Sequence, residues 1–291
     1  HTRYDPRMPD EKVRDRVIRL TAQQFDFFGA CVQQGLPMAM LMVLGTEGST
    51  YSKSGQVMLV GANGEMHGML SGGCLEGDLV ERALRAIETG RQEIAEYDLI
   101  NDDELFGFGV GCEGVMRILV QPLTDLADVE LDSFPVDANI LGPRQILVLG
   151  GGLDADPLVE IASTLGWRVI VADRKPVNLE RLGKRCEVID SGEAGFDDAV
   201  LEGRFDAAIV KTHNLVRDRE HLELLAQTDV PFIGLLGPPH RRERILSESA
   251  GLAEEIGSRL HGPVGTRIGG RGPAAVALEI AAELQAFFAD S

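Results

Sequence analysis

A run of three glycines, Gly150-Gly151-Gly152, constrains the fold of this chain more than any other feature of its sequence. The run directly follows the apolar segment 145–149 and precedes a stretch of helical length. A tight connection between a buried strand and a helix needs residues without a Cβ atom, because backbone approaches backbone there. The pattern predicts the first strand-to-helix turn of a doubly wound parallel sheet.

Strand-like and helix-like segments alternate after this turn. Residues 168–172, 205–210 and 231–235 are short apolar runs separated by stretches long enough for helices, and 274–288 has the pattern of a final long helix. The runs are continuously apolar, as in strands that are buried on both faces of a parallel sheet. We therefore expect an α/β fold in which residues 144–291 form a Rossmann-like, doubly wound parallel-sheet domain.

The first half of the chain has a mixed pattern. Apolar residues recur at helical spacing within 11–34 and 75–87, and Gly90 is suited to end the second helix. Asn63-Gly64, between two apolar runs, is the strongest hairpin signal in the chain. We expect an N-terminal α+β domain with strands at 39–44, 57–60 and 115–120.

A change of composition separates the two halves. Between 125 and 142 the sequence is acidic, contains Asp and Pro at intervals and shows no sustained period, which is typical of an interdomain connection. A chain of 291 residues is long enough for two domains, each with its own core. We predict an N-terminal domain at 1–125, a linker at 126–143 and a Rossmann-like domain at 144–291.

Charge and cysteine content exclude several classes of function. The formal net charge of −18 opposes binding to nucleic acid, which depends on clustered Lys and Arg. No apolar stretch is long enough for a membrane span, and no signal peptide is evident at the start of the sequence. The four cysteines contain no C-x-x-C pair, so no zinc knuckle is indicated. We expect a cytoplasmic protein.

The glycine turn resembles a dinucleotide-binding fingerprint. The pattern Gly150-x-Gly152-x-x-Ala155 is followed by Asp173, 21 residues after Gly152, where an acidic residue often contacts a ribose. Asp154 and Asp156 argue against a bound pyrophosphate, because two carboxylates beside the turn repel it. NAD(P) therefore stays an alternative ligand.

One of those two carboxylates also has a structural interpretation. Asp156 precedes Pro157, and this order is typical of a helix N-cap followed by the first helical residue.

A glycine loop with a cysteine lies in the first half. Ser71, Gly72, Gly73 and Cys74 precede Glu76 at the expected start of a helix, where the helix dipole favours a thiolate. The glycines also leave N–H groups that suit an anion. The alternative is a small residue packed at a tight turn.

Two further glycine segments accompany this loop. Residues 106–114 place Cys112 between glycines, and residues 45–51 combine glycines with hydroxyl groups after a strand, which suits an oxyanion. A flexible turn and a polar surface turn are the respective alternatives. Cys31 on the first helix and Cys186 before a strand are interpreted as structural.

Other candidate ligand contacts lie in the second half. Thr212 and His213 follow the strand 205–210 at the carboxyl edge, where open α/β sheets bind ligands. Arg241, at the start of a helix, is suited to bidentate phosphate binding. A simple hydrogen bond for His213 and a solvated face for Arg241 are the alternatives.

Taken together, the motifs in both halves resemble the XdhC/CoxI family. In the first half the resemblance is carried by residues 45–51, 55–59, 71–76 and 111–114. In the second half it is carried by 212–214 with Asp218, by 234–237 with His240 and Arg241, and by 262–265 with 268–269 and Pro273. These motifs span nearly the whole chain and keep the family order.

The resemblance implies an accessory factor for molybdenum hydroxylases such as xanthine and carbon monoxide dehydrogenases. Such a factor binds the molybdopterin cofactor, assists its sulfuration and delivers it to the enzyme, so it acts as a maturation chaperone more than as a stand-alone enzyme. The implied partners are an apo molybdenum hydroxylase and a sulfur donor, and a homodimer is possible. Cys74 becomes a candidate contact to molybdenum or sulfur, because a soft thiolate suits either.

Two other functions stay open at this point. An NAD(P)-dependent oxidoreductase is favoured by the Gly150 turn with Asp173, although no Tyr and Lys pair at helical spacing is present. A pure protein-interaction factor with a vestigial dinucleotide fold is favoured by the acidic pair Asp154 and Asp156.

Overall fold

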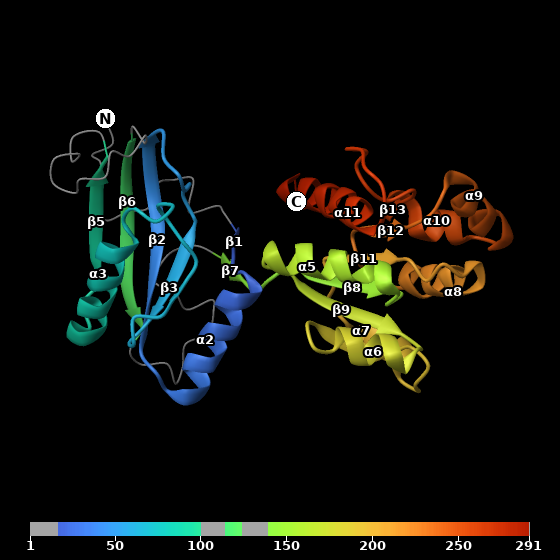
Figure 1. Cartoon of the computed structure of the whole chain (residues 1–291), viewed down its shortest axis with the longest axis horizontal. Coiled ribbons are helices and arrows are strands. Elements are labelled where there is room, and N and C mark those ends of the chain that lie inside the picture. Colours follow the sequence, from blue (N-terminus) through green and yellow to red (C-terminus); the bar gives the residue numbers. More distant parts are fainter. Residues whose placement is uncertain (1–16, 100–113, 124–138, 291) are drawn as a thin grey trace. The chain divides into compact units, whose positions relative to one another are not determined.

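The computed structural model describes residues 17–99, 114–123 and 139–290 (Figure 1). The chain divides into two compact units between Gly142 and Pro143. Within the described ranges no helix combines the length and the hydropathy that a bilayer crossing requires.

A five-stranded antiparallel sheet forms the centre of the first unit. Its spatial order is β4-β3-β2-β6-β5, and the long strands β2 and β6 pair along their whole length. The hairpin expected at Asn63-Gly64 is confirmed, since β3 and β4 pair across it. The strands are β2 (Met38–Gly48), β3 (Val57–Gly61), β4 (Met66–His67), β5 (Glu93–Asp98) and β6 (Gly114–Leu123).

Two helices cover opposite faces of this sheet. Side chains alternate along β2, so Met40 packs with Phe28 of α2 (Ala22–Gln34), whereas Leu41 packs with Leu79 of α3 (Glu76–Thr89). All four of these side chains are buried. Gly90 ends α3 in the left-handed conformation, as the sequence indicated.

The first helix begins later than its apolar pattern suggested. Thr21 caps α2 in a reciprocal capping box with Gln24, so the helix starts at Ala22. The preceding residues form β1 (Val17–Arg19), which pairs in parallel with β7 (Asn139–Leu141). The predicted helix within 11–34 was therefore wrong for residues 17–19, and its residues 11–16 lie outside the described residues. The predicted linker 126–143 contains the paired strand β7 near its end.

A six-stranded parallel sheet forms the second unit, which confirms the Rossmann-like, doubly wound prediction. Its order is β10-β9-β8-β11-β12-β13. The chain therefore adds β9 and β10 on one side of β8, and then adds β11, β12 and β13 on its other side. The strand expected after Cys186 is present as β10, whereas the two-residue strand β13 was missed. The strands are β8 (Gln145–Leu149), β9 (Arg168–Asp173), β10 (Glu187–Asp190), β11 (Ala207–Val210), β12 (Ile233–Leu235) and β13 (Leu260–His261).

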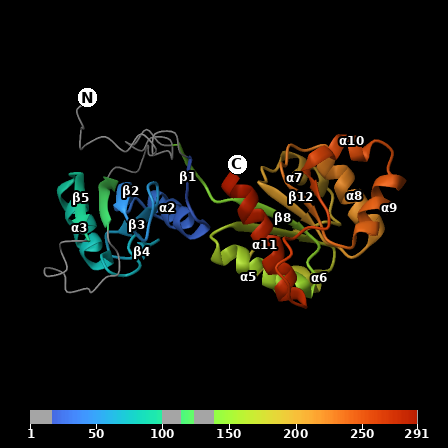
Figure 2. The same cartoon turned by 90° about the horizontal axis from the view of Figure 1, so that it is seen from above.

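Helices lie on both faces of this sheet (Figure 2). One face carries α5 (Asp156–Thr164), α6 (Pro176–Leu182) and α11 (Pro273–Asp290), and α5 packs directly on α11. The other face carries α7 (Phe196–Glu202), α8 (Leu215–Ala226), α9 (Pro239–Glu248) and α10 (Leu252–Ile256).

The order of this sheet places a switch point between β8 and β11. The connections that follow these two strands lead to helices on opposite faces, α5 and α8. Open α/β sheets bind ligands outside the carboxyl ends of the strands at such a point. The residues after β8 and β11 are therefore the candidates for a ligand site.

Candidate functional site

The glycine turn after β8 lies directly against the end of β11. Gly150 has a φ of +121°, and a Cβ atom built on it would lie 2.6 Å from the carbonyl oxygen of Lys211. Only glycine fits this position, because it tolerates both the left-handed backbone and the close approach. The turn thus brings the connection after β8 next to the connection after β11.

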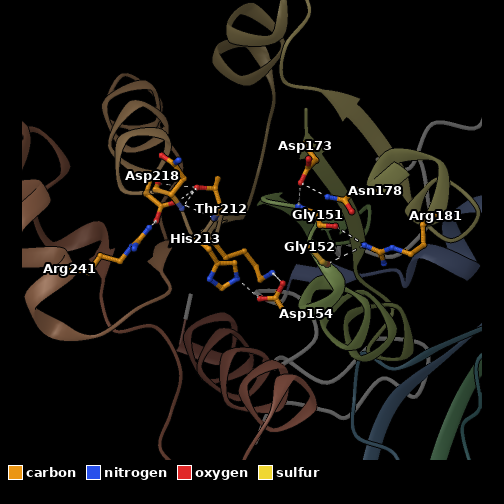
Figure 3. A network of polar contacts seen from close by, with 12 residues as sticks. Gly151, Gly152, Asp154, Asp173, Asn178, Arg181, Thr212, His213, Asp218 and Arg241 are labelled. Carbon is orange, nitrogen blue, oxygen red and sulfur yellow. Dashed lines mark hydrogen bonds and ion pairs between the residues drawn. The ribbon is translucent and has the colours of Figure 1, made fainter. Parts of the chain in front are cut away.

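Three charged or titratable side chains meet at this junction, and we call them the Asp154–Lys211–His213 centre. Lys211 is 2% exposed, and its Nζ lies 2.9 Å from Oδ1 of Asp154. The Nε2 atom of His213 lies 2.7 Å from the other carboxylate oxygen, Oδ2. Figure 3 shows Asp154 and His213 turned toward each other below the loop that carries Thr212.

Burial dominates the electrostatics of Lys211. Loss of solvation lowers the pKa of its ammonium, and the nearby carboxylates of Asp154 and Asp173 only partly offset this effect. Among the described residues the ammonium has no well-directed hydrogen-bond partner, although it forms the ion pair with Asp154. The hydrogen-bonding capacity of this buried ammonium is therefore not used within the described residues.

Asp154 responds in the opposite way. Its partial burial favours the neutral acid, but the ion pair with Lys211 and the contact with His213 outweigh that effect and lower its pKa. Asp154 is thus a carboxylate held between two nitrogen donors, and the repulsion expected from the sequence is largely compensated.

The backbone of His213 is held in an unusual conformation. Its φ of +58° makes it the single non-glycine residue with a left-handed backbone in the described ranges. Such a conformation is uncommon for a residue with a side chain and is concentrated at functional sites. Asn214 follows it and caps α8 by accepting hydrogen bonds from Val216 and Arg217, which fixes the loop from its far side.

The guanidinium of Arg241 fixes this loop through Asp218 and is not an unpaired group that faces the site. Its Nε and one terminal nitrogen donate to the same oxygen of Asp218, at 2.9 and 2.5 Å. Asp218 is fully buried, and its other oxygen accepts from the backbone N–H and the hydroxyl of Thr212. The bidentate phosphate contact predicted for Arg241 is therefore corrected, because its guanidinium forms its two hydrogen bonds with Asp218. The backbone N–H and hydroxyl of Thr212 also donate to Asp218.

Asp173 fastens the glycine turn from the β9 side. Its carboxylate accepts from the backbone N–H of Gly151 at 2.7 Å, from the N–H of Lys175 at 2.8 Å and from the Asn178 amide at 3.1 Å (Figure 3). Burial opposes its ionisation, but these hydrogen bonds prevail and lower its pKa. Asp173 lies at the strand end that the fingerprint indicated, and its contact with a ribose stays a prediction.

Asp156 is not the N-cap that the sequence suggested. Ala155 occupies that position without a side-chain cap, and the Asp156 carboxylate pairs with Arg181 and Arg185. Arg181 also donates to the carbonyl oxygen of Gly151 at 2.7 Å. The charge of Asp156 is therefore neutralised within the protein.

The glycine loop of the first unit folds around an internal anion. The carboxylate of Glu76, which is 6% exposed, accepts from the backbone N–H groups of Leu70, Ser71 and Gly73 at 2.8–2.9 Å and from the hydroxyl of Ser71. Burial opposes the charge, but these donors lower the pKa of Glu76. The predicted role of these N–H groups as a cradle for an external anion is thus corrected, because Glu76 already occupies them.

Cys74 lies two residues before α3 and is partly buried. It packs against the apolar cluster that contains Leu75 and Leu79. Gly72 beside it has a φ of +77°, and the ring of Tyr51 lies 3.1 Å from where its Cβ would be. Cys112, the second predicted cysteine contact, lies outside the described residues.

The third glycine segment also differs from expectation. Residues 45–48 belong to strand β2 and pair with β6, after an irregularity in register between Val43 and Gly45. Gly48 pairs with Gly114, where a Cβ atom would lie 2.4 Å from the carbonyl oxygen of Glu47. Gly114 thus allows close packing of β6 on β2, and the expected loop begins only at Ser49.

The structure therefore groups the predicted site residues into two sets. Ser71, Gly72, Gly73, Cys74 and Glu76 lie in one loop of the first unit. Gly150, Gly152, Asp173, Thr212, His213 and Arg241 surround the switch point of the second unit.

Sequence analysis missed Lys211, Asn178 and Arg181. Lys211 was detectable as an ionisable residue that directly follows a buried strand. The described ranges contain no group of three His, Cys, Asp or Glu side chains suited to a metal ion.

Comparison with known proteins identifies both units. Residues 146–284 match the family described as the XdhC Rossmann domain, and residues 31–98 match the XdhC and CoxI family. A similar relative, from Bacillus subtilis (strain 168), is named as a probable xanthine dehydrogenase subunit and is 26% identical over 83% of this chain and 90% of that protein.

Two further comparisons extend this result. The uncharacterized protein YqeB of Escherichia coli (strain K12) is 27% identical over 87% of this chain, which spans 44% of the length of YqeB. A crystal structure of a xanthine dehydrogenase from Bacillus halodurans shares the fold, with a TM-score of 0.70, 23% identity, and coverage of 91% of this chain and 95% of that one. With family matches in both units and in the same order, the chain belongs to the XdhC and CoxI family.

Proposed function

We propose that this protein is an accessory factor for the maturation of a xanthine dehydrogenase-type molybdenum hydroxylase. The observation that carries the proposal is the family match in both units, together with the relative named as a probable xanthine dehydrogenase subunit. The partner would be the apo form of that enzyme. A protein of this kind acts by binding and delivering a cofactor.

The cofactor in this proposal is molybdopterin, which supplies the client enzyme with its molybdenum centre. Cys74 suits a soft contact to molybdenum or sulfur, because the residue is only partly buried and lies next to glycines without side chains. The backbone N–H groups of the same loop do not suit the phosphate, because Glu76 uses those of Leu70, Ser71 and Gly73. The anionic part of the ligand therefore needs a cation from elsewhere in the chain.

Sulfuration of the cofactor would require a sulfur donor protein as a second partner. In that case the role of Cys74 is to hold the cofactor or its sulfur close to the backbone of residues 71–73 until delivery. A Cys74→Ser substitution keeps the size of the side chain and removes the soft ligand, so it separates this role from packing.

The test is co-expression of the protein with an apo molybdenum hydroxylase in cells that make molybdopterin. The pterin that is bound to the purified protein is oxidised to a fluorescent form, and its fluorescence is measured. The molybdenum content of the client enzyme is measured separately. We expect retained pterin with the wild type and loss with Cys74→Ser. Cys186→Ser is the matched control, because Cys186 is also partly buried and donates only to the carbonyl of Leu182. Absence of pterin from the wild type would rule the proposal out.

A second candidate function is an NAD(P)-dependent oxidoreductase. It is favoured by one observation, the position of Asp173 at the end of β9 with its hydrogen bond to Gly151 in the glycine turn. Calorimetric titration with NAD and NADP tests it. Tight nicotinamide binding that is lost in Asp173→Ala would favour this function over the first.

A further inference from the structure

The carboxyl edge of the second unit is less acidic than the chain as a whole. The whole sequence has 46 acidic against 28 basic residues. The connections that follow strands β8 to β13 instead carry two acidic residues, Asp154 and Glu193, against five basic ones. These basic residues are Arg174, Lys175, Lys211, Arg267 and Arg271. Asp173 and Asp190 at the ends of β9 and β10 bring the acidic residues of this edge to four against five basic ones, so the edge lacks the excess of negative charge of the whole chain and repels an anionic ligand less.

Lys211 is the one basic residue of this set that is buried, with an exposed fraction of 2%. An ammonium group that is removed from water without hydrogen bonds is unfavourable by several kcal/mol, by rough estimate. Asp154 offsets part of this through the ion pair at 2.9 Å, but no well-directed hydrogen bond satisfies the ammonium among the described residues. An incoming oxyanion would supply the missing acceptors.

Apolar side chains surround the same edge. The four most exposed large apolar side chains of the second unit all lie in a connection or in the first turn of a helix at the carboxyl ends of the strands. They are Leu153 at 78%, Val177 at 67%, Ile268 at 56% and Val216 at 53%. Exposed apolar groups around a few polar anchors are typical of sites for small molecules that combine a ring with a charged group.

We propose that the Asp154–Lys211–His213 centre binds the phosphate group of a small phosphorylated ligand that also has an apolar ring system. Lys211 is the anchoring cation, His213 is a second donor, and Asp154 orients both. Two sources share this chemistry, a phosphorylated pterin and a ribonucleotide. The inference depends on the burial and charge of Lys211, so it holds whether or not the chain matures a molybdenum hydroxylase.

The surrounding contacts explain how the centre keeps its geometry. Arg241 binds Asp218, which binds both the backbone and the hydroxyl of Thr212, between Lys211 and His213. On the other side, Asp173 and Arg181 hold Gly151, so the turn that carries Asp154 is fixed as well. A preorganised site of this kind loses little conformational entropy when a ligand binds.

The experiment is calorimetric titration of the full chain with three probes: inorganic pyrophosphate, AMP and a phosphorylated pterin. We expect saturable binding, and we expect Lys211→Met to weaken it at least about tenfold, since a charge-assisted hydrogen bond is lost. Lys184→Met is the matched control, because Lys184 is an exposed lysine in the connection that precedes β10, and the affinity of this variant should stay within about twofold of the wild type.

A second variant shows whether a loss of binding in Lys211→Met comes from a loss of folding. Asp154→Asn combined with Lys211→Met removes the unpaired carboxylate that the single change leaves, and it too should lose phosphate binding while it remains folded. Tighter binding of AMP than of the pterin identifies a nucleotide site, and the reverse order identifies a pterin site; either order supports the proposal. Wild-type affinity in folded Lys211→Met, or no saturable binding of any probe to the wild type, would overturn it. Retention of pterin in the co-expression test together with wild-type affinity for the probes in folded Lys211→Met would contradict this inference alone.

Discussion

Nζ of Lys211 lies 2.9 Å from Oδ1 of Asp154, and the two residues come from connections after different strands, β11 and β8. The pair joins the glycine turn to the left-handed His213 at the switch point of the parallel sheet. Because Lys211 is buried, the pair affects stability as well as binding, and the two effects can be measured separately.

Removal of only one partner of this pair should destabilise the protein. Lys211→Met leaves the Asp154 carboxylate with His213 alone, and we expect a loss of about 1–3 kcal/mol in the free energy of unfolding. The double variant Asp154→Asn with Lys211→Met should recover most of that loss, because no unpaired charge remains. Urea denaturation followed by circular dichroism measures both values, and equal losses in the single and double variants would contradict the expectation.

The pH dependence of stability should show the lowered pKa of Lys211. Burial lowers this pKa below its ordinary value of 10.5, so between the two values the folded chain binds fewer protons than the unfolded chain. Stability of the wild type should therefore rise with pH through that window, relative to Lys211→Met. Denaturation curves from neutral to alkaline pH measure the difference, and parallel curves for the two proteins would refute it.

Glu76 should stabilise the first unit through its ionised form. Its hydrogen bonds lower its pKa below the ordinary value of 4.5, so this contribution is present above that value and is lost as pH falls through the folded-state pKa. Glu76→Gln should cost about 1–3 kcal/mol at neutral pH and flatten the acid limb of the stability curve. Glu81→Gln is the control, because Glu81 lies on the same helix and is 74% exposed. An unchanged acid limb in Glu76→Gln would contradict the assignment.

Gly150 should not tolerate a side chain. Gly150→Ala combines a left-handed backbone with a Cβ atom 2.6 Å from the carbonyl oxygen of Lys211, so we expect a loss of about 3 kcal/mol or more. Gly195→Ala separates the two causes, because Gly195 has a φ of +95° but no atom within 4 Å of an added Cβ. Its loss should be about 1–2 kcal/mol. Thermal unfolding compares the two variants, and similar losses would show that the close contact is unimportant.

Substitution of Arg241, which donates two hydrogen bonds to Asp218, should lower the free energy of unfolding more than substitution of an arginine in an exposed ion pair. Arg241→Lys removes one of the two hydrogen bonds to a fully buried carboxylate, and we expect a loss of about 1–3 kcal/mol. Arg244→Lys on the same helix should change stability by less than about 0.5 kcal/mol, because Arg244 is 63% exposed in its pair with Glu248. Chemical denaturation of both variants provides the measurement, and equal effects would argue against the positioning role of Arg241.

Local patterns were sufficient to predict most of the elements. The continuous apolar runs led to β8, β9, β11 and β12, and the glycine turn led to the doubly wound sheet, because strand burial and turn geometry depend on neighbouring residues. The strand β13 was missed, since a run of two residues carries too little periodic signal. Val17–Arg19 was assigned to a helix because its pairing with β7 involves residues more than a hundred positions away.

The sequence by itself determined the fold class and the family, because apolar periodicity, glycine turns and motif order are all local properties of the chain. Only the tertiary structure decided how charges pair. Asp154 and Asp156 appear as repelling carboxylates along the chain, yet Lys211, His213, Arg181 and Arg185 neutralise them from other connections and helices. The Glu76 carboxylate likewise fills the loop that seemed open to an anion. Electrostatic pairing depends on distances across the fold, which residue spacing alone does not define.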